Sequence, residues 1–402
     1  MHRATGSSRT VIVAGAGIGG LSAALALVRK NFRVVVVDKA HRLEEAGAGL
    51  QLSPNVTRIL IALGAGERLS RTAVAIDAIR VRSQRNRAIV DIPLGSDAEL
   101  RFGSPYWAAH RGDLQAALLD TAQAHPDIEI ELDLKVESFV SHPNGVTVQC
   151  RRGDRLTDRH GIALIGADGV WSTLRERLGE EAPRFAGRTA WRATLPAMAL
   201  TPEYRCRNVH LWLGGKAHLV AYPVKAETAV NLVAIAADDT ATLGWSTESA
   251  RAEVLAHFSR WFWSQHVRDI LALPDGWLRW PLYDRPPLAS WGHGRMTLLG
   301  DAAHPMLPFL AQGAGMAIED GFVLAEHLAD AGDDIEPALR HYEAQRGPRT
   351  ARVQRGARRN DMLYHFRWPA SLARNMALRA MGGRRLLDRY DWIYDWRFAP
   401  SG

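Results

Sequence analysis

The chain has 402 residues, of which 47% are hydrophobic and 23% charged, so a disordered protein is excluded and a large core in about two or three domains is expected. The formal net charge of +7 favours anionic ligands such as nucleotides and carboxylates. Cys150 and Cys206 fit no metal or redox motif, and free thiols are ordinary in a reducing compartment. The polar start carries no apolar run of signal-peptide or membrane-spanning length, so we expect a soluble cytoplasmic protein.

The first forty residues predict a βαβ unit. Residues 10–14 are short, apolar and β-branched, as in a buried parallel strand. An apolar helix over 18–30 follows, and a second strand over 33–37 ends at Asp38.

The turn between the first strand and the helix matches the dinucleotide fingerprint GxGxxG. Gly15 permits the tight turn, Gly17 lets the backbone approach a pyrophosphate, and Gly20 lets the helix pack closely on the strand. The helix that begins at Ile18 presents free N–H groups to phosphates, and Asp38 can bind ribose hydroxyls. The fingerprint fits FAD and NAD alike, and the alternative is a glycine-rich turn without a ligand.

Later segments add further strands and helices. The segments 208–213, 217–224 and 229–237 are apolar or alternating and predict an antiparallel meander. In chain order we also expect a helix over 113–124, strands over 128–140, 145–150, 162–165 and 296–299, a helix over 315–330 and helical structure from about 336 onward.

Two further glycine motifs resemble those of the group A flavoprotein hydroxylases. Residues 164–175 (LIGADGVWSTLR) resemble the DG motif of that family. Residues 298–304 (LLGDAAH), extended through Pro305, Pro308 and 312–314, resemble its GD motif. Two more segments, 110–114 (HRGDL) and 47–55 (GAGLQLSPN), match the family in its order and spacing.

This resemblance implies an α/β fold. A single Rossmann-like FAD-binding domain of the glutathione-reductase type would be interrupted by a β-sheet substrate domain and followed by a helical C-terminal tail. The chain has one GxGxxG, as the single-domain flavin hydroxylases do. The implied domains are 1–72, 101–182 and 288–345 for FAD, 73–100 and 183–287 for the substrate, and 346–402 for the tail.

The resemblance also implies the activity of a monooxygenase that hydroxylates a small aromatic substrate, and the basic charge favours a hydroxylated aromatic acid. NADH or NADPH would reduce non-covalently bound FAD, O₂ would add at C4a, and the hydroperoxide would deliver oxygen to the ring. Two alternatives stay open. One is a reductase or dehydrogenase of the same fold that does not activate O₂, and the other is a non-catalytic protein that binds FAD or nucleic acid.

The residues expected to bind FAD lie in these motifs. Asp301 can accept hydrogen bonds from ribityl hydroxyls, and Arg111 can pair with the phosphate or the ribityl chain. Asp168 is expected to order the loop around the pyrophosphate, and the amides at the start of the later helix can face the flavin. The expected set is Gly15, Gly17, Ile18, Gly20, Asp38, Lys39, Gly49, Arg111, Asp168, Asp301, Gly313 and Ala314.

One protein task remains, which is to take a proton from the substrate hydroxyl, and histidine suits it. Alternation along 217–224 places His218 and Tyr222 on one strand face, and the resemblance implies that this face looks onto the substrate. The alternatives are a satisfied strand histidine and simple sheet packing, while His304 is a less favoured base. Gln312, Pro308 and Arg192 are substrate-binding candidates, and no metal site is expected.

Arginines repeat every third residue from Arg346 to Arg358, interleaved further on with Trp and Tyr. The pattern could bind single-stranded nucleic acid, but no RNA-binding motif accompanies it. We therefore expect a solvated helical face with domain or homodimer contacts, and no nucleic-acid or membrane partner.

Overall fold

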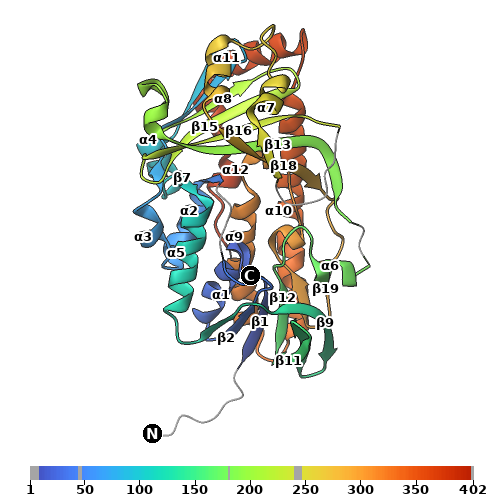
Figure 1. The fold of residues 1–402 in the computed structure, drawn as a ribbon. Helices are drawn as coiled ribbons and strands as arrows, with labels where there is room; N and C mark the ends of the chain where they lie inside the picture. The colour runs from blue at the N-terminus through green and yellow to red at the C-terminus, as the bar shows by residue number, and fades with distance from the viewer. Residues whose placement is uncertain (1–8, 44–47, 180–181, 240–246, 400–402) are drawn as a thin grey trace.

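A six-stranded sheet forms the lower part of the structure in Figure 1, a computed structural model that describes residues 9–43, 48–179, 182–239 and 247–399. Gly47 of the expected 47–55 motif and residues 1–8 of the polar start lie outside these ranges. The strands run parallel except for the edge strand β19, and their apolar side chains are buried. In spatial order they are β19 (Gly292–His293), β20 (Met296–Leu298), β12 (Ala163–Gly166), β1 (Thr10–Ala14), β2 (Arg33–Val37) and β8 (Ile128–Glu131).

Helices and a small antiparallel sheet bury this sheet. The helices are α1 (Ile18–Val28), α5 (Arg111–Gln123) and α9 (Gly313–Ala329), and the small sheet is β9 (Lys135–His142), β10 (Gly145–Arg152) and β11 (Arg155–Gly161). Val148 and Cys150 of β10 belong to the same apolar core as the strands and helices. The helix α1 approaches α9 closely, because a Cβ on Gly321 would lie 2.8 Å from the backbone of Ala23.

An eight-stranded sheet forms the upper part of the structure (Figure 1). One of its faces packs against α7 (Arg251–His257) and α8 (Gln265–Ala272) around the buried side chains of Trp191, Trp212 and Trp277. In spatial order its strands are β17 (Thr247–Ala250), β18 (Gly276–Asp284), β13 (Arg184–Pro196), β16 (Ala229–Ala237), β15 (Ala217–Val224), β14 (Asn208–Leu213), β5 (Ala78–Ser83) and β6 (Ala88–Pro93). Only β14 and β5 pair in parallel among the described strands of this sheet.

Two connections tie the sheets together. A three-stranded sheet of β3 (Gly49–Leu52), β7 (Trp107–His110) and β4 (Val74–Ala75) is one of them. The other is α10 (Ile335–Tyr364), which packs on α9 and continues along the upper sheet, and α11 (Ala370–Asp388) then packs on β6. The remaining elements are α2 (Pro54–Ala62), α3 (Gly66–Ser70), α4 (Gly95–Phe102), α6 (Thr173–Arg177), α12 (Asp391–Tyr394) and short 3₁₀ helices over 197–199, 202–204, 300–302 and 308–310.

The expected mixed α/β fold is confirmed, including the antiparallel meander, but single elements differ. The strand expected over 128–140 is two strands, β8 and β9, because Asp133 between them has a φ of 58° and turns the chain. The long strand β13 was missed; a register shift at Gly187, with φ 69°, interrupts its pattern. The tail boundary expected at 346 falls inside α10, which continues through it.

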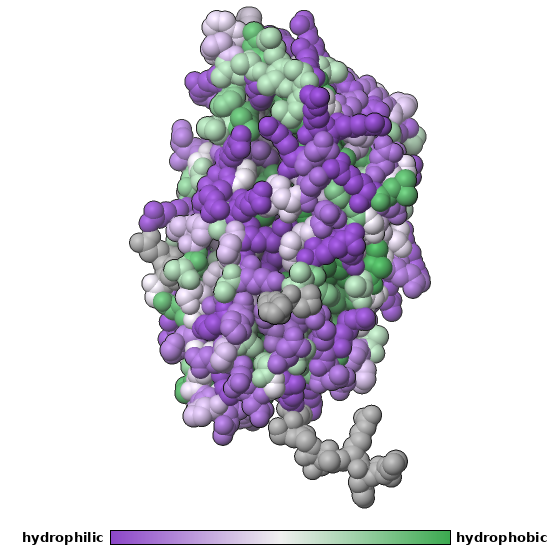
Figure 2. Space-filling view, turned by 180° about the vertical axis from the view of Figure 1, so that it is seen from behind, coloured by the Kyte–Doolittle hydropathy of each residue, from purple (hydrophilic) through white to green (hydrophobic). Residues whose placement is uncertain are grey.

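The arginine series on α10 is not one solvated face. Arg346 is buried and pairs with Glu319 at 2.7 Å, and Arg358 pairs with Asp284 at 2.6 Å, whereas Arg355 is exposed. That part of the expectation is wrong, because α10 lies between other elements and acidic side chains meet it on two sides. Figure 2 shows a largely hydrophilic surface on the opposite face of the molecule from Figure 1, with apolar side chains in patches. No helix in the described ranges is both long and apolar enough for a membrane span.

Candidate active site

A cavity of about 430 Å³ lies between the two large sheets, a size usual for small-ligand sites. Its lower wall comes from the loop after β1, the ends of β2 and β12, and the starts of α5 and α9. Its upper wall is the face of β13, β15 and β16 that points away from α7 and α8. The expected site residues among its lining are Gly15, Gly17, Ile18, Asp38, Lys39, Gly49, Arg111, Asp168, Arg192, His218, Tyr222, Asp301, Pro308, Gly313 and Ala314.

The glycines of the loop after β1 have different physical tasks. Gly15 has a φ of 111°, and a Cβ there would lie 2.3 Å from the carbonyl oxygen of Ala167. A Cβ on Gly20, which does not line the cavity, would lie 1.8 Å from the Gly15 oxygen. A Cβ on Gly17 would meet no atom within 4 Å, so the space in front of it is open. That open cradle, at the start of α1, fits a pyrophosphate.

Asp38 holds the glycine loop in place. Its Oδ2 accepts a hydrogen bond from the amide of Ala16 at 2.6 Å, and its Oδ1 accepts one from the amide of Ala40 at 2.8 Å. Each carboxylate oxygen keeps a second lone pair, so the same side chain can also accept from a ribose hydroxyl. Sequence reasoning predicted the ribose contact and missed the support of the loop.

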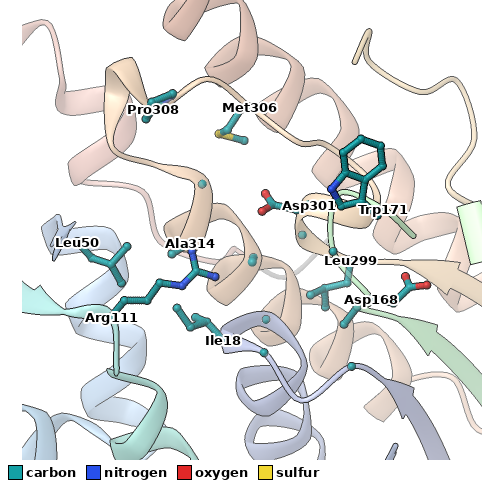
Figure 3. A pocket seen from close by; sticks show the side chains of 18 of the residues that line it. Ile18, Leu50, Arg111, Asp168, Trp171, Leu299, Asp301, Met306, Pro308 and Ala314 are labelled. Atoms are coloured by element: carbon teal, nitrogen blue, oxygen red, sulfur yellow. The ribbon is translucent and has the colours of Figure 1, made fainter. Parts of the chain in front are cut away.

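Arg111 and Asp301 carry opposite charges into the middle of the cavity (Figure 3). Asp301 is exposed to the cavity, which itself lies inside the protein, so burial raises the pKa of its carboxyl while Arg111 opposes that rise. Burial lowers the pKa of Arg111, and Asp301 opposes that change. A ligand with hydroxyls and phosphates would hydrogen-bond both groups and replace the water they have lost.

The start of α9 faces the same space. Gly313 and Ala314 line the cavity, and the side chain of the N-cap residue, Gln312, makes no capping hydrogen bond to the helix amides. The first amides of this 17-residue helix therefore point their N–H groups and dipole at a bound ring. With the Gly17 cradle, Asp38, Arg111 and Asp301, this end of the cavity has the donors and acceptors that FAD requires.

Asp168 and Gln312 support neighbouring backbone and side chains. Asp168 lines the cavity, and its Oδ2 accepts a hydrogen bond from the amide of Leu174 at 3.3 Å, which holds the loop between them. Burial raises the pKa of Asp168, against its hydrogen bonds to Ser172 and the backbone. Gln312 does not line the cavity and donates instead to Ser53 Oγ at 2.8 Å. The substrate contact proposed for Gln312 would require it to leave that partner.

The upper wall carries three ionisable side chains, those of Arg192, His218 and Tyr222. Val220 of β15 pairs with Val233 of β16, which pairs with Arg192 of β13, and His218 and Tyr222 flank Val220 on the same face. His218 is 2% exposed, and its Nδ1 lies 2.9 Å from Nε2 of His365 at the end of α10. Burial lowers the pKa of His218 well below its usual value, with His365 and Arg188 adding to the effect. His218 is therefore neutral at neutral pH, and Nε2 is the ring nitrogen left for a ligand.

Tyr222 and His304 are less suited than His218 to take a proton from a ligand in the cavity. Burial raises the pKa of the Tyr222 hydroxyl, so it stays protonated near neutral pH and can donate a hydrogen bond. Tyr222 also packs against Gly49, where a Cβ would lie 2.5 Å from the ring. His304 does not line the cavity, and its Nε2 lies 2.5 Å from the carboxylate of Asp320.

Arg192 is the cation of the upper wall. Its guanidinium lies 4.4 Å from the ring centre of Trp280, and its buried Nε has no hydrogen-bond partner among the described residues. Burial lowers the pKa of Arg192 to about 10, with Tyr222 opposing and Arg111 adding to the change. Arg192 is still charged at neutral pH, so an anion in the cavity would stabilise it.

Several residues at the site were not among the expected site residues, although some of them lie inside the motif segments. Trp171, Met306 and Leu50 line the cavity near the FAD motifs (Figure 3). His365 is 147 residues from the histidine that it contacts. Among the described residues no group of three or more His, Cys, Asp and Glu side chains is placed to hold a metal ion.

Comparison with known proteins agrees with this geometry. The model of the FAD binding domain family matches residues 8–357. The chain is 37% identical to 3-hydroxybenzoate 6-hydroxylase 1 of Aquipseudomonas alcaligenes, over 97% of this chain and 98% of that protein. It is 36% identical to 3-amino-4-hydroxybenzoate 2-monooxygenase PtnB3 of Streptomyces platensis, over 100% and 99%. The crystal structure of Klebsiella pneumoniae HpxO with FAD and uric acid superposes with a TM-score of 0.84 at 26% identity, over 95% and 96%.

The fold and the cavity therefore define a flavoprotein of the FAD-binding type. The chain belongs to the FAD binding domain family, and its relatives place it with the FAD-dependent aromatic hydroxylases and monooxygenases. The resemblance noted in the sequence and the expected cofactor, FAD, are confirmed.

Proposed function

We propose that this protein hydroxylates a hydroxylated aromatic acid, with Arg192 binding the carboxylate and His218 taking the proton of the ring hydroxyl. When bound, FAD supplies the redox chemistry, accepting electrons from NADH or NADPH and activating O₂. The observation that carries the proposal is the shared wall. Arg192, whose buried Nε has no hydrogen-bond partner in the described part of the chain, and the neutral imidazole of His218 face one cavity that the FAD motifs also line.

The spacing of the wall suits a single ring. Arg192 lies two strands from β15, and His218 lies two residues along β15 from Val220, so the Cα atoms of Arg192 and His218 are roughly 12 Å apart. Their side chains extend into the cavity from both ends of this span. Val220 and Val233 lie between them and offer an apolar surface to the ring.

The neutral state of His218 suits a general base. It can accept a proton at Nε2, while Tyr222 can donate a hydrogen bond to the developing phenolate. The two relatives named above have hydroxylated benzoates in their names, which supports the same substrate class for this chain. A cytoplasmic location, a homodimer and the lack of a nucleic-acid partner remain predictions.

A matched pair of compounds tests the proposal. Purified holoenzyme is given 3-hydroxybenzoate or its neutral amide, and NADH oxidation, O₂ uptake and hydroxylated product are followed together. We expect product from the acid and a kcat/KM about 10²-fold lower for the amide, because a buried cation loses its partner. NADH oxidation without O₂ uptake would indicate a reductase, and equal turnover of the amide would contradict the role of Arg192.

A further inference from the structure

Beyond the cavity, His218 is the inner end of a chain of polar contacts. His218 Nδ1 lies 2.9 Å from His365 Nε2, and His365 Nδ1 lies 2.9 Å from Asp361 Oδ1. The same His365 Nδ1 lies 2.8 Å from the backbone oxygen of Asp361. Asp361 Oδ1 also accepts a hydrogen bond from Arg188 Nε at 2.9 Å. This series of contacts joins β15 of the upper sheet to the last turn of α10.

The acceptors along this chain fix where the protons lie. His365 Nδ1 faces two oxygens of Asp361, both acceptors, so it must carry a proton. A neutral His365 then has an unprotonated Nε2, which requires His218 to donate from Nδ1. A neutral His218 with its proton on Nδ1 keeps the lone pair on Nε2. Nε2 is the nitrogen that a substrate hydroxyl in the cavity can reach.

The same series of contacts leads from the interior of the protein to its surface. His218 is 2% exposed and the His365 side chain 3%, whereas the side chains of Asp361 and Arg188 are 21% and 16% exposed. Arg188 and His365 both contact Oδ1 of Asp361, which leaves Oδ2 for solvent.

Two aromatic rings also pack beside the imidazole of His218. The rings of Phe309 and Tyr364 lie 5.6 Å and 5.4 Å from its imidazole and form apolar walls. Burial raises the pKa of Tyr364, so its hydroxyl stays neutral. Arg188 from β13 and Asp361 from α10 are charged groups near the pair of histidines, and Arg374 from α11 donates to the backbone oxygens of Leu363 and Tyr364 beside them.

We propose that His365 and Asp361 form a proton relay that fixes the tautomer of His218 and carries the substrate's proton to solvent. The inference rests on the proposed function. The substrate O–H bond breaks and its proton binds His218 Nε2. The Nδ1 proton of His218 passes to His365 Nε2, and the Nδ1 proton of His365 passes to Asp361 and then to water. The relay runs backward when a product hydroxyl regains a proton, which restores both rings.

Two variants separate the relay from simple packing. His365→Gln keeps an acceptor for the Nδ1 proton of His218 but cannot pass a proton on, and Asp361→Asn keeps an acceptor for His365 but stays unprotonated. The control is His327→Gln, a half-buried histidine bonded to Gln345 at 2.7 Å and away from the cavity. Each holoenzyme is mixed with 3-hydroxybenzoate in dilute buffer, and proton release is followed with an indicator dye beside product formation and FAD content.

Wild type and His327→Gln should release about one proton per bound substrate. The two relay variants should retain FAD and substrate affinity but release the proton about 10²-fold more slowly at neutral pH, the low end for loss of general-base catalysis. Their rates should recover as pH rises, because the substrate then ionises in solution. In wild type, the release rate should depend non-linearly on the D₂O fraction, since several protons move.

The outcomes distinguish the two proposals. If wild type hydroxylates the acid and both variants match it at every pH, the relay is wrong and the proposed function stands. If wild type makes no product from hydroxylated acids, the proposed function fails and the relay with it. If either variant loses FAD, the relay is tested by the D₂O measurement on wild type. A proton-release rate that depends linearly on the D₂O fraction would then overturn the relay.

Discussion

Arg346 of α10 reaches Asp320 of α9 at 2.6 Å, and both side chains are buried. The second oxygen of Asp320 lies 2.5 Å from His304 and also accepts a hydrogen bond from the amide of Gly300, the residue before Asp301. Burial would raise the pKa of Asp320, but His304 and Arg346 hold it below its usual value. The ion pair therefore connects α10, through Asp320, to the loop that presents Asp301.

Replacing Arg346 should lower stability without touching the cavity directly. Arg346→Met leaves Asp320 and Glu319 as buried charges with fewer partners, so the free energy of unfolding should fall by about 3–5 kcal/mol. Arg355→Met, on the exposed side of the same helix, should change it by less than about 0.5 kcal/mol. Urea unfolding of both variants and wild type measures the difference, and equal losses would contradict the role of the ion pair.

Two glycines of one loop should respond in opposite ways to alanine. Gly17 has a φ of −73° and open space around a Cβ, so Gly17→Ala should fold normally and bind FAD more weakly, because the methyl group enters the cofactor's space. A Cβ on Gly20 would lie 1.8 Å from a backbone oxygen, so Gly20→Ala should destabilise the whole protein. Thermal unfolding with FAD titration separates the two effects, and a stable Gly20→Ala protein would contradict the packing argument.

The ionised carboxylate of Asp301 should lower the stability of the protein without FAD. Its folded pKa is raised, so its stabilising contribution is present below its unfolded pKa of about 3.9 and is lost as pH rises through the folded value. Asp301→Asn should therefore raise the Tm of flavin-free protein at neutral pH. The variant should also show a smaller increase in Tm on acidification than wild type. The same change should weaken FAD binding, because a charged acceptor is lost.

The exposed Asp154 is the matched control for Asp301, since Asp154→Asn changes the charge equally without affecting the cavity. Differential scanning calorimetry between pH 5 and 8 gives the comparison. A lower Tm for flavin-free Asp301→Asn than for wild type would show that the ionised carboxylate does not destabilise the protein.

Local patterns predicted much of this molecule. The βαβ unit follows from short β-branched strands around a glycine turn, and Asp38, Arg111 and Asp301 lie in motifs of a few residues. Strand alternation placed His218 and Tyr222 on one face, and both line the cavity. In each case the information lies within about ten residues of the side chain concerned.

Contacts made by distant segments could not be predicted in this way. His365 contacts His218, and Asp361 contacts His365, because α10 crosses from one sheet to the other, and no periodicity within α10 marks those two residues. Arg346 has the sequence surroundings of an exposed arginine, yet Glu319 and Asp320 meet it from another helix. Gln312 lies in a cofactor motif but faces Ser53, 259 residues away.

Loss of His218 should separate chemistry from cofactor binding. His218→Ala should retain FAD, since the lower wall is intact, and lose roughly 10²–10⁴-fold in hydroxylation. Tyr222→Phe should be milder, because it removes one hydrogen bond and keeps the ring against Gly49. Single-turnover kinetics with the FAD absorbance as control measure both. Wild-type hydroxylation by His218→Ala would assign the proton to another group, and loss of FAD would make His218 structural.

Arg192 should set the preference for a carboxylate. Arg192→Met removes the cation and keeps much of the packing against Trp280, so kcat/KM for 3-hydroxybenzoate should fall by about 10²-fold, as for a buried charge pair that loses one partner. Turnover of the neutral amide should change little, because it never used the charge. Arg192→Lys should recover part of the loss, since it restores charge without the planar fork. Steady-state kinetics of the three proteins on both compounds give the comparison, and equal losses on acid and amide would mean that Arg192 supports the wall rather than the substrate's carboxylate.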